Sequence, residues 1–401
     1  GVNMGKKRAF LSRGVQRFLD RSIGTLKRGR LEMFLPNGEL ISNEGEQGEW
    51  HGVLEIKRWR TFNQLMRRGD IGFAEAYVRG DWDSPDLTGL MCTLADNLDS
   101  FTGDFGAQGL DRIWTTLQHA LRRNSKKQSS RNIEAHYDLG NTFYELWLDS
   151  TMTYSSALFV DKTAELEAAQ RIKYQRILDQ ADLSPGSHIL EIGCGWGGFA
   201  EFAVEAGHRV TGITISPAQL AFASQRLDSA IHAGAAELVL QDYRDLRGRF
   251  DAIVSIEMFE AVGKQWWGSF MQTLKRNLKP GGKAVVQTIH IKEDLFESYN
   301  KRADFIQTYI FPGGMLPSPD RFTHIASQAG LACRDIHHFG ASYAETLKRW
   351  QKNFNGVEND VRFLGFDTEF MRLWNFYFSY CISGFDSGRT GVAQYTLQAA
   401  R

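Results

Sequence analysis

Apolar positions recur with a helical period near the start of the chain, and the period changes further along. Between residues 9 and 26, apolar side chains such as Val15 and Leu19 follow this spacing, and lysines and arginines occupy the positions between them. We expect a basic amphipathic helix here, which either packs on its own domain or docks on anionic phospholipid headgroups. Residues 31–97 then mix strand-like runs with a helical segment at 71–79, which predicts a small α+β domain.

A polar and basic stretch separates this domain from the rest of the chain. Residues 122–131 contain no apolar side chain, which is typical of a linker. We therefore expect one domain at 4–121, a basic linker at 122–134 and a second domain at 135–401.

The second domain alternates predicted strands with predicted helices. Several apolar runs have the length of buried strands, and the segments between them have helical periodicity. Alternation at this spacing predicts an α/β fold in which helices cover both faces of a doubly wound, parallel sheet. The expected strands are 189–192, 210–215, 237–241, 251–256 and 282–291, and the expected helices are 161–179, 217–227 and 264–278.

An insertion rich in aromatic residues, at 293–385, interrupts this alternation. It contains a loop at 309–318, which we expect to act as a lid or pocket wall, and a segment at 370–380 with apolar side chains nearly all round a helix. Such a helix is buried in a core or lines an apolar cavity. Core packing is the commoner case, but so many aromatics in one insertion favour an acyl-chain pocket. A last strand is expected at 390–397.

A glycine-rich turn follows the first strand of the second domain. Gly193, Gly195 and Gly198 satisfy the dinucleotide-binding pattern G-x-G-x-x-G, so the spacing alone does not identify the cofactor. A dinucleotide site also needs an acidic residue about 20 positions later, and the strand that ends at residue 215 carries none there. Glu191 instead precedes the first glycine in E-x-G-x-G-x-G, the arrangement found in S-adenosylmethionine methyltransferases.

Polar side chains also follow the other predicted strands. Thr214, Asp242 and Glu257 each lie at or just after the end of a strand. Ligands of doubly wound sheets bind beyond the carboxyl ends of the strands. We therefore expect these residues and the glycine turn to surround one pocket.

Composition excludes several classes of function. Lysine plus arginine and aspartate plus glutamate each number 47 among 401 residues, so the net charge gives no sign of nucleic-acid binding. The four cysteines fall in no paired pattern, so neither a metal site nor a disulfide framework is expected. No apolar run approaches the roughly 18 residues of a membrane-spanning helix, and we expect a cytoplasmic protein that at most lies on a membrane.

Several separate motifs together resemble those of cyclopropane-fatty-acyl-phospholipid synthases and related lipid methyltransferases. The resemblance extends over most of the chain, and the small domain is similar to the amino-terminal lipid-associated domain of bacterial members. It implies a class I methyltransferase fold, which is Rossmann-like, and S-adenosylmethionine as the cofactor. The motifs are His136-Tyr137-Asp138, Gly140-Asn141, Met152-Thr153-Tyr154-Ser155, residues 191–198, 210–216, 241–245, 255–263 and 309–318, and Phe339-Gly340 with Tyr343.

The resemblance also implies which residues hold the cofactor. Asp242 can accept a hydrogen bond from the adenine amino group, and Gln219 offers an amide to the ribose hydroxyls. The implied cofactor residues are Tyr154, Ser155, Gly193, Gly195, Gly197, Thr214, Ile215, Gln219, Asp242 and Tyr243.

The implied reaction is an electrophilic methylation of a lipid double bond. The alkene attacks the sulfonium methyl group, and the resulting carbocation must lose a proton to close a three-membered ring. In the family the base is a bound bicarbonate, which the side chains of Glu260, Gln287 and Tyr343 and the backbone at Ser156 and Ile289 would hold here.

Two positions depart from the best-known members of the family. Ser156 stands where they have cysteine, and Gln287 stands where they have histidine. The serine matters little if its contact is through the backbone, but an amide neither titrates nor carries charge. The product therefore stays open, because ring closure, a methylene or methyl-branched chain, and a methylated furan precursor all start from the same step.

The expected substrate is an unsaturated phospholipid, which the enzyme meets peripherally at the inner face of a membrane. The basic helix would bind the anionic surface, and a homodimer is a candidate assembly. A small-amine N-methyltransferase is an alternative of the same fold, and the basic amino terminus argues against it. A non-catalytic membrane-binding scaffold is an alternative of another class, and the intact glycine turn with Glu260 and Tyr343 argues against it.

Overall fold

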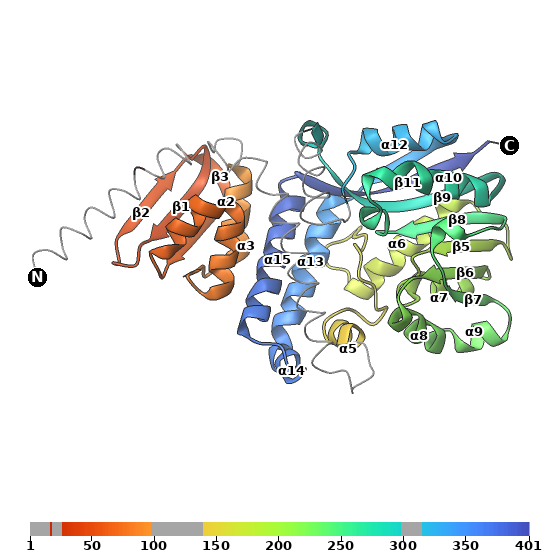
Figure 1. Cartoon of the computed structure of the whole chain (residues 1–401), viewed down its shortest axis with the longest axis horizontal. Coiled ribbons are helices and arrows are strands. Elements are labelled where there is room, and N and C mark those ends of the chain that lie inside the picture. Colours follow the sequence, from red (N-terminus) through yellow and green to blue (C-terminus); the bar gives the residue numbers. More distant parts are fainter. Residues whose placement is uncertain (1–16, 18–25, 98–138, 298–314, 401) are drawn as a thin grey trace, which may run out of the picture. The chain divides into compact units, whose positions relative to one another are not determined.

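The chain divides into two compact units, which are described separately below. In the computed structural model, residues 17, 26–97, 139–297 and 315–400 are described (Figure 1). One unit comprises residues 1–128 with 362–387, and the other comprises 129–361 with 388–401. The expected basic helix at 9–26 lies outside the described residues, apart from its residues 17 and 26. The expected linker at 122–134 and most of the loop at 309–318 also lie outside them.

The amino-terminal unit is built on a four-stranded sheet with the order β2-β1-β3-β4. Strand β1 is antiparallel to β2 and parallel to β3, and β3 is antiparallel to β4. This arrangement matches the small α+β domain expected at the start of the chain. Its elements are β1 (Arg28–Phe34), β2 (Leu40–Glu44), β3 (Glu46–Ile56), α2 (Arg60–Arg79), β4 (Trp82–Asp83), α3 (Leu87–Asp96) and α15 (Thr368–Asp386).

Helix α2 extends well before the segment expected at 71–79. It begins at Arg60 and ends where Gly80 takes the left-handed conformation, with φ of 83°. Glycine adopts this conformation without the cost that a side chain would add. The end of the helix at residue 79 was therefore predicted correctly from the sequence, whereas its start was not.

Helix α15 belongs with the amino-terminal unit, which differs from the expectation that all of 293–385 belongs to the methyltransferase domain. The ring of Phe376 lies 5.7 Å from that of Tyr77 and 6.4 Å from that of Trp82. Arg372 lies 3.9 Å from the centre of the Tyr77 ring, and its guanidinium donates to the carbonyls of Tyr77 and Trp82. The aromatic residues of α15 therefore fill the core of the amino-terminal unit.

The second unit contains a seven-stranded sheet with the order β10-β11-β9-β8-β5-β6-β7. All neighbours are parallel except β11, which runs antiparallel to both β9 and β10. The mostly parallel sheet confirms the expected class I methyltransferase fold. The strands are β5 (His188–Ile192), β6 (Arg209–Thr214), β7 (Ala236–Leu240), β8 (Phe250–Ile256), β9 (Leu278–Ile291), β10 (Leu331–His338) and β11 (Thr390–Ala399).

Helices cover the sheet of the second unit on both faces. Ile189 and Val254 pack with Ile177 and Phe199 of two helices on one face. Leu190, the next residue along β5, points to the other face and is also fully buried. The helices of this unit are α5 (Leu139–Glu145), α6 (Leu166–Ala181), α7 (Gly198–Glu205), α8 (Pro217–Arg226), α9 (Asp228–His232), α10 (Trp267–Asn277), α12 (Pro319–Gln328) and α13 (Gly340–Gly356), and the short α14 (Glu358–Phe363) follows them.

The expected helix at 161–179 starts later than its expected first residue, Asp161. Helix α6 begins at Leu166, and the carboxylate of Asp161 instead accepts the backbone N–H of Thr163 at 2.9 Å. Aspartate stabilises turns in the same way as it caps helices, so the residue type alone does not separate the two. Within the described ranges, no helix is both long and apolar enough to cross a membrane, and no group of metal-ligating side chains gathers.

Candidate active site

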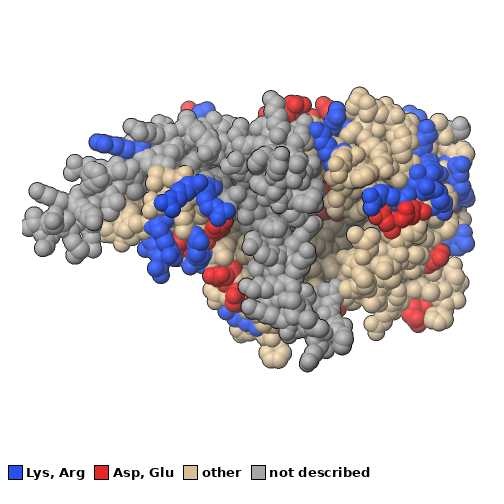
Figure 2. Space-filling model, viewed as in Figure 1, with Lys and Arg blue, Asp and Glu red and all other residues tan. Residues whose placement is uncertain are grey.

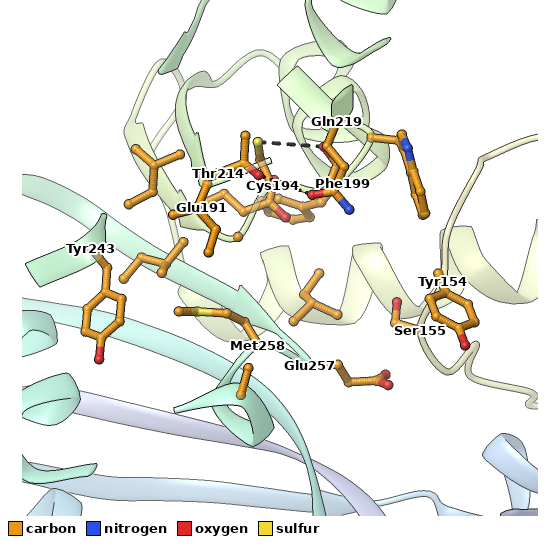
Figure 3. Close-up of a pocket in the computed structure, with 18 of the residues that line it drawn as sticks. Tyr154, Ser155, Glu191, Cys194, Phe199, Thr214, Gln219, Tyr243, Glu257 and Met258 are labelled. Atoms are coloured by element: carbon orange, nitrogen blue, oxygen red, sulfur yellow. Dashed lines mark hydrogen bonds between the residues drawn. The ribbon is translucent and has the colours of Figure 1, made fainter. Parts of the chain in front are cut away.

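A cavity of about 570 Å³ opens at the carboxyl ends of β5, β6 and β8. The order of the strands reverses here, because β6 lies on one side of β5 and β8 on the other. Such a switch point separates the loops that follow adjacent strands and leaves room for a ligand. The position of the cavity agrees with the pocket expected from the strand ends (Figure 3).

The glycine turn between β5 and α7 brings bare backbone to the cavity. Gly193 and Gly195 have φ of 80° and 55°, a region that favours glycine. A Cβ added at Gly195 would meet no atom within 4 Å, so it would project into open space. A cofactor can therefore approach the backbone of this turn closely.

Nine of the ten implied cofactor residues line the cavity, and Gly197 is the exception. The nine are Tyr154, Ser155, Gly193, Gly195, Thr214, Ile215, Gln219, Asp242 and Tyr243. Gly197 has φ of 90°, and a Cβ there would meet Ala223 at 3.2 Å and Leu227 at 3.3 Å. This glycine allows α8 to pack closely against the turn, and its role in cofactor binding stays a prediction.

The polar residues at the far side of the cavity suit a nucleoside. Thr214 donates its hydroxyl to the side-chain oxygen of Gln219 at 3.2 Å, which leaves the Gln219 amide N–H groups available. The guanidinium of Arg244 donates to the Asp242 carboxylate and lowers the pKa of that carboxyl. An ionised Asp242 retains lone pairs that can accept from an adenine amino group.

Glu191 presents an unsatisfied carboxylate oxygen in the same cavity. The residue is buried, and its Oε1 has no hydrogen-bond partner within the described part of the chain. Burial raises the pKa of Glu191 to about 8, and the nearby Lys173 opposes this rise. A buried polar atom without a hydrogen-bond partner destabilises the protein unless a ligand supplies the missing hydrogen bond. The amine and the sulfonium charge of S-adenosylmethionine fit this position, so the cavity residues fit the implied cofactor.

Aromatic side chains surround Tyr154 at one wall of the cavity. Its ring lies 4.9 Å from that of Tyr144 on α5 and 5.2 Å from that of Trp350 on α13. Trp147 contacts Tyr154 edge to face at 5.7 Å. These rings make the wall apolar and present electron-rich faces, which suits a reaction that passes through a cation.

Glu257 lies on the same side of the cavity as Ser155 and Tyr154 (Figure 3). Its Oε2 accepts the backbone N–H of Ser156 and the side-chain amide of Gln287, both at 2.7 Å. Its Oε1 accepts the hydroxyl of Tyr343. Burial raises the pKa of Glu257, and the positive charge of Lys173 and these three donors oppose the rise.

A buried lysine completes this part of the site. Lys173, on α6, is fully buried and donates to the hydroxyl of Ser155 at 2.7 Å. Burial lowers the pKa of Lys173 to about 7, although Glu257, Asp149 and Glu191 all favour its charged form. The lysine charge therefore depends on three carboxylates, two of which line the cavity.

A chain of hydrogen bonds fixes the orientation of Gln287. Its side-chain oxygen accepts from the amide of Gln394 at 3.1 Å, and Gln394 accepts from Arg176 at 2.8 Å. Arg176 is held in turn by Asp335 at 2.6 Å. Since the oxygen of Gln287 is engaged on this side, its N–H groups face Glu257 and the carbonyl of Ser156.

The implied anion-binding residues divide between two neighbouring carboxylates. Ser156, Gln287 and Tyr343 meet Glu257, whereas Glu260 accepts from the Thr288 hydroxyl at 2.6 Å and from the backbone N–H of Ile289. The short helix Phe259–Ala261 turns Glu260 toward β9. Burial and the neighbouring Glu257 raise the pKa of Glu260. Glu257 therefore accepts from Gln287 and Tyr343, Glu260 accepts from Thr288 and Ile289, and the anion-binding role expected of Glu260 stays a prediction.

Sequence reasoning placed Glu257 at a strand end but gave it no role, and it missed Lys173 entirely. Glu257 could have been found from its position beyond a parallel strand. Lys173 lies within a helix of mixed polarity, and nothing in its neighbours along the chain distinguishes it from an exposed lysine.

Comparison with known proteins agrees with this geometry. The model of the mycolic acid cyclopropane synthetase family matches residues 124–395. The tuberculostearic acid methyltransferase UfaA1 of Mycobacterium tuberculosis is 39% identical, over 83% of this chain and 80% of its own length. The cyclopropane-fatty-acyl-phospholipid synthase of Escherichia coli K12 is 32% identical, over 86% of this chain and 88% of its own.

A solved structure shows the same fold around a cofactor product. The mycolic acid cyclopropane synthase CmaA1, complexed with SAH and CTAB, has a TM-score of 0.60 and 30% identity, and it covers 67% of this chain and 97% of its own. Sequence, fold and cavity thus agree on S-adenosylmethionine as the cofactor. The chain belongs to the mycolic acid cyclopropane synthetase family of S-adenosylmethionine-dependent methyltransferases.

Proposed function

We propose that this enzyme methylates the double bond of unsaturated acyl chains in phospholipids and forms cyclopropane or methyl-branched chains. The observation that carries the proposal is that the cofactor cavity meets a partly buried, hydrogen-bonded carboxylate beside an aromatic wall. An electrophilic methylation needs these three parts: a cofactor site, a base and surroundings without water. The similarity to lipid-modifying relatives supports the choice of substrate.

The proposed roles of the cavity residues follow from their chemistry. When bound, S-adenosylmethionine supplies an electrophilic methyl group. Gln219 and Asp242 hold the nucleoside, and Glu191 accepts from the amine. Tyr154 and Trp350 exclude water and orient the acyl chain, because a carbocation survives only where no water can attack it. Alignment of two reactants in this way is worth roughly 7–11 kcal/mol of the barrier.

The test is a direct assay of the lipid product. The protein is incubated with radiolabelled S-adenosylmethionine and vesicles of unsaturated phospholipid, with saturated phospholipid vesicles as the matched control and a panel of small amines in parallel. We expect label in the unsaturated lipid alone, and mass analysis of the acyl chain then identifies the product. Label in an amine and none in lipid would instead support the N-methyltransferase alternative.

We also propose that the amino-terminal unit binds the anionic surface of the inner membrane face. Figure 2 shows lysine and arginine side chains gathered on the visible face of this unit. Arg58, Arg60 and Arg79 all lie within 4.0 Å of the buried carboxylate of Asp81, so three positive charges share one negative partner. The excess charge and the basic residues expected at 9–26 favour anionic headgroups. A homodimer stays a prediction.

A further inference from the structure

The carboxylate of Glu257 occupies the hydrogen-bond donors that the family resemblance assigns to a separate anion. The Ser156 backbone N–H, the Gln287 amide and the Tyr343 hydroxyl all donate to its two oxygens. Bicarbonate also presents carboxylate oxygens to its donors, so one set of donors suits either group. In this chain the acceptor is part of the protein itself.

The backbone at Glu257 supports a functional reason for this placement. Its φ of 52° lies in the left-handed region, where a non-glycine residue is strained. Strain of this kind persists only where the surrounding structure fixes it, and it is concentrated at active sites. A carboxylate that served only for stability would gain nothing from a strained, partly buried position that faces a cofactor cavity.

The amide of Gln287 also fits a fixed carboxylate. The hydrogen bonds from Gln394, itself held by Arg176, direct the Gln287 N–H groups toward Glu257. An amide donates at every pH, whereas an imidazole loses a donor when it is neutral. The glutamine that departs from the best-known family members is therefore matched to the glutamate that it contacts.

We propose that Glu257 is the catalytic base of this enzyme and that no separate anion is required. The inference rests on the function proposed above. Methyl transfer to the double bond leaves a carbocation on the acyl chain. A proton then leaves the added methyl group or a neighbouring chain carbon, and its C–H electron pair closes the ring or forms a double bond. The proton moves to a carboxylate oxygen of Glu257, so that the cation and the carboxylate become a neutral chain and a carboxylic acid.

The pH dependence of the reaction follows from the groups that face Glu257. Lys173 on α6 and Tyr343 on α13 favour its ionised form, whereas burial and the neighbouring Glu260 favour the protonated form. Because burial dominates, the pKa of Glu257 is raised, and the base is active only above that pKa. Turnover should therefore increase with pH over a range above that of an ordinary carboxyl group.

A paired substitution tests the assignment. Glu257→Gln keeps the size of the side chain and removes the base, and Glu260→Gln makes the same change three residues away. We expect Glu257→Gln to reduce turnover by at least about 10²-fold, the usual contribution of a positioned proton acceptor, and Glu260→Gln to reduce it less than tenfold. Affinity for S-adenosylhomocysteine, measured by calorimetry, should change far less than turnover in Glu257→Gln.

Glu257→Gly tests whether a bicarbonate ion can replace the carboxylate of Glu257. Glycine accepts the left-handed conformation without strain and leaves a space lined by the same three donors. In buffer free of carbon dioxide, added bicarbonate should restore the turnover of Glu257→Gly at least tenfold. It should not restore Glu257→Gln, whose side chain fills the space, and it should not affect the wild-type enzyme.

Thermal unfolding gives a measure that does not depend on turnover. The folded protein raises the pKa of Glu257, so the stability that the protonated side chain provides is present at low pH and is lost as the pH rises through the folded pKa. Glutamine mimics the protonated form. The Tm of the wild-type protein should therefore fall relative to that of Glu257→Gln between pH 5 and pH 9.

Each result separates this inference from the proposed function. If wild-type enzyme labels no lipid, the proposed function fails before the base is tested. If the wild type labels lipid, full turnover of Glu257→Gln would overturn the inference, as would a wild-type requirement for bicarbonate or a Glu257→Gly protein that bicarbonate does not restore. A Tm difference that does not vary with pH would also overturn it, because the carboxyl would then not titrate in the folded protein.

Discussion

Lys173 connects the two carboxylates of the cavity by charge. Its ammonium is fully buried, and it favours the ionised forms of both Glu257 and Glu191. Each carboxylate in turn favours the charged lysine, whose pKa burial lowers to about 7. The ionisation of Glu257, the proposed base, and that of Glu191 are therefore coupled through one side chain.

Replacement of Lys173 by methionine should move the pH profile of turnover. Burial raises the pKa of Glu257, and the positive charge of Lys173 opposes this rise. Without that charge the pKa of Glu257 rises further, so the increase of turnover with pH shifts to higher pH. The profile of kcat against pH measures this shift. Lys348→Met, which removes an exposed lysine of the same unit, is the matched control. An identical profile for Lys173→Met and the wild type would contradict the coupling.

Cofactor affinity should depend on the ionisation of Glu191. Burial raises the pKa of Glu191 to about 8, so near neutral pH the carboxyl is largely protonated before a cationic ligand arrives. A cation favours the carboxylate, and binding must then release a proton. We expect the affinity for S-adenosylmethionine to increase from pH 6 to pH 8, by at most about tenfold per pH unit, and to level off above pH 8.

Titration calorimetry in buffers of different ionisation enthalpy measures the proton release. In Glu191→Gln the increase of affinity between pH 6 and pH 8 should be largely lost. If the wild-type affinity did not vary with pH in this range, the site would hold Glu191 ionised already, and the assigned role would be wrong.

The two glutamates at 257 and 260 show where sequence reasoning about the site ends. Both follow the same strand, and the family resemblance pointed to Glu260. The left-handed backbone at Glu257 and the short helix after it decide which carboxylate meets Tyr343. A sequence does not record the backbone conformation, so the pattern located the strand end and nine residues that line the cavity, but not the carboxylate that accepts from Tyr343.

At the scale of elements, the glycine turn owes its geometry to close packing as much as to ligand binding. Gly198 begins α7, and a Cβ there would lie 2.7 Å from the hydroxyl of Tyr174 and 3.0 Å from that of Thr153. These two hydroxyls are hydrogen-bonded to each other at 2.7 Å. The helix can start at this point only because the residue has no side chain.

Gly198→Ala should destabilise the methyltransferase unit by about 1–3 kcal/mol, because it forces the Tyr174 and Thr153 hydroxyls apart. Gly268→Ala is the matched control, since Gly268 also lies in a helix, and a Cβ there would meet nothing within 4 Å. Alanine at 268 should stabilise by roughly 0.5–1 kcal/mol through helix propensity. Thermal unfolding compares the two, and equal Tm values for both variants would contradict the packing argument.

Periodicity predicted the elements better than it predicted their neighbours. The strands β5, β6, β8 and β11 were expected within a few residues of their observed bounds. The aromatic helix α15 was also expected as a helix, but its contacts with Tyr77 and Trp82 join residues nearly 300 positions apart. Which distant surface covers an apolar helix is a tertiary property, and the local pattern does not contain it.

At the scale of the whole molecule, the sequence indicated the fold class and the presence of two domains. The alternation of strands and helices was sufficient for the parallel part of the sheet. The return of residues 362–387 to the amino-terminal unit was not predicted. A domain boundary can be recognised from composition only where the chain between the two domains is polar. The segment that returns to that unit is rich in aromatic residues, so its composition does not indicate a boundary.

The proposed binding to membranes would depend on how positive charge is distributed over the amino-terminal unit. Arg67 and Arg68 are exposed on α2, and Arg58 and Arg60 lie at or near its start. Leu26 is 2% exposed, so a truncation that removes residues 4–25 stops before the first buried residue that the structure describes. The truncation separates the contribution of the expected basic helix from that of the arginines on α2.

We expect the truncated protein to bind vesicles of anionic phospholipid more weakly than the full chain, since each basic residue near such a surface contributes about 1 kcal/mol. Replacing Arg67 and Arg68 with glutamine should weaken binding further, and 0.5 M salt should reduce the binding of every variant because it screens exposed charges. Sedimentation with vesicles measures binding, neutral phospholipid vesicles are the control, and affinity for S-adenosylhomocysteine should be equal in all variants. If the truncated protein sediments with anionic vesicles as completely as the full chain at low salt, residues 4–25 do not bind the membrane, and the expected helix serves its own domain instead.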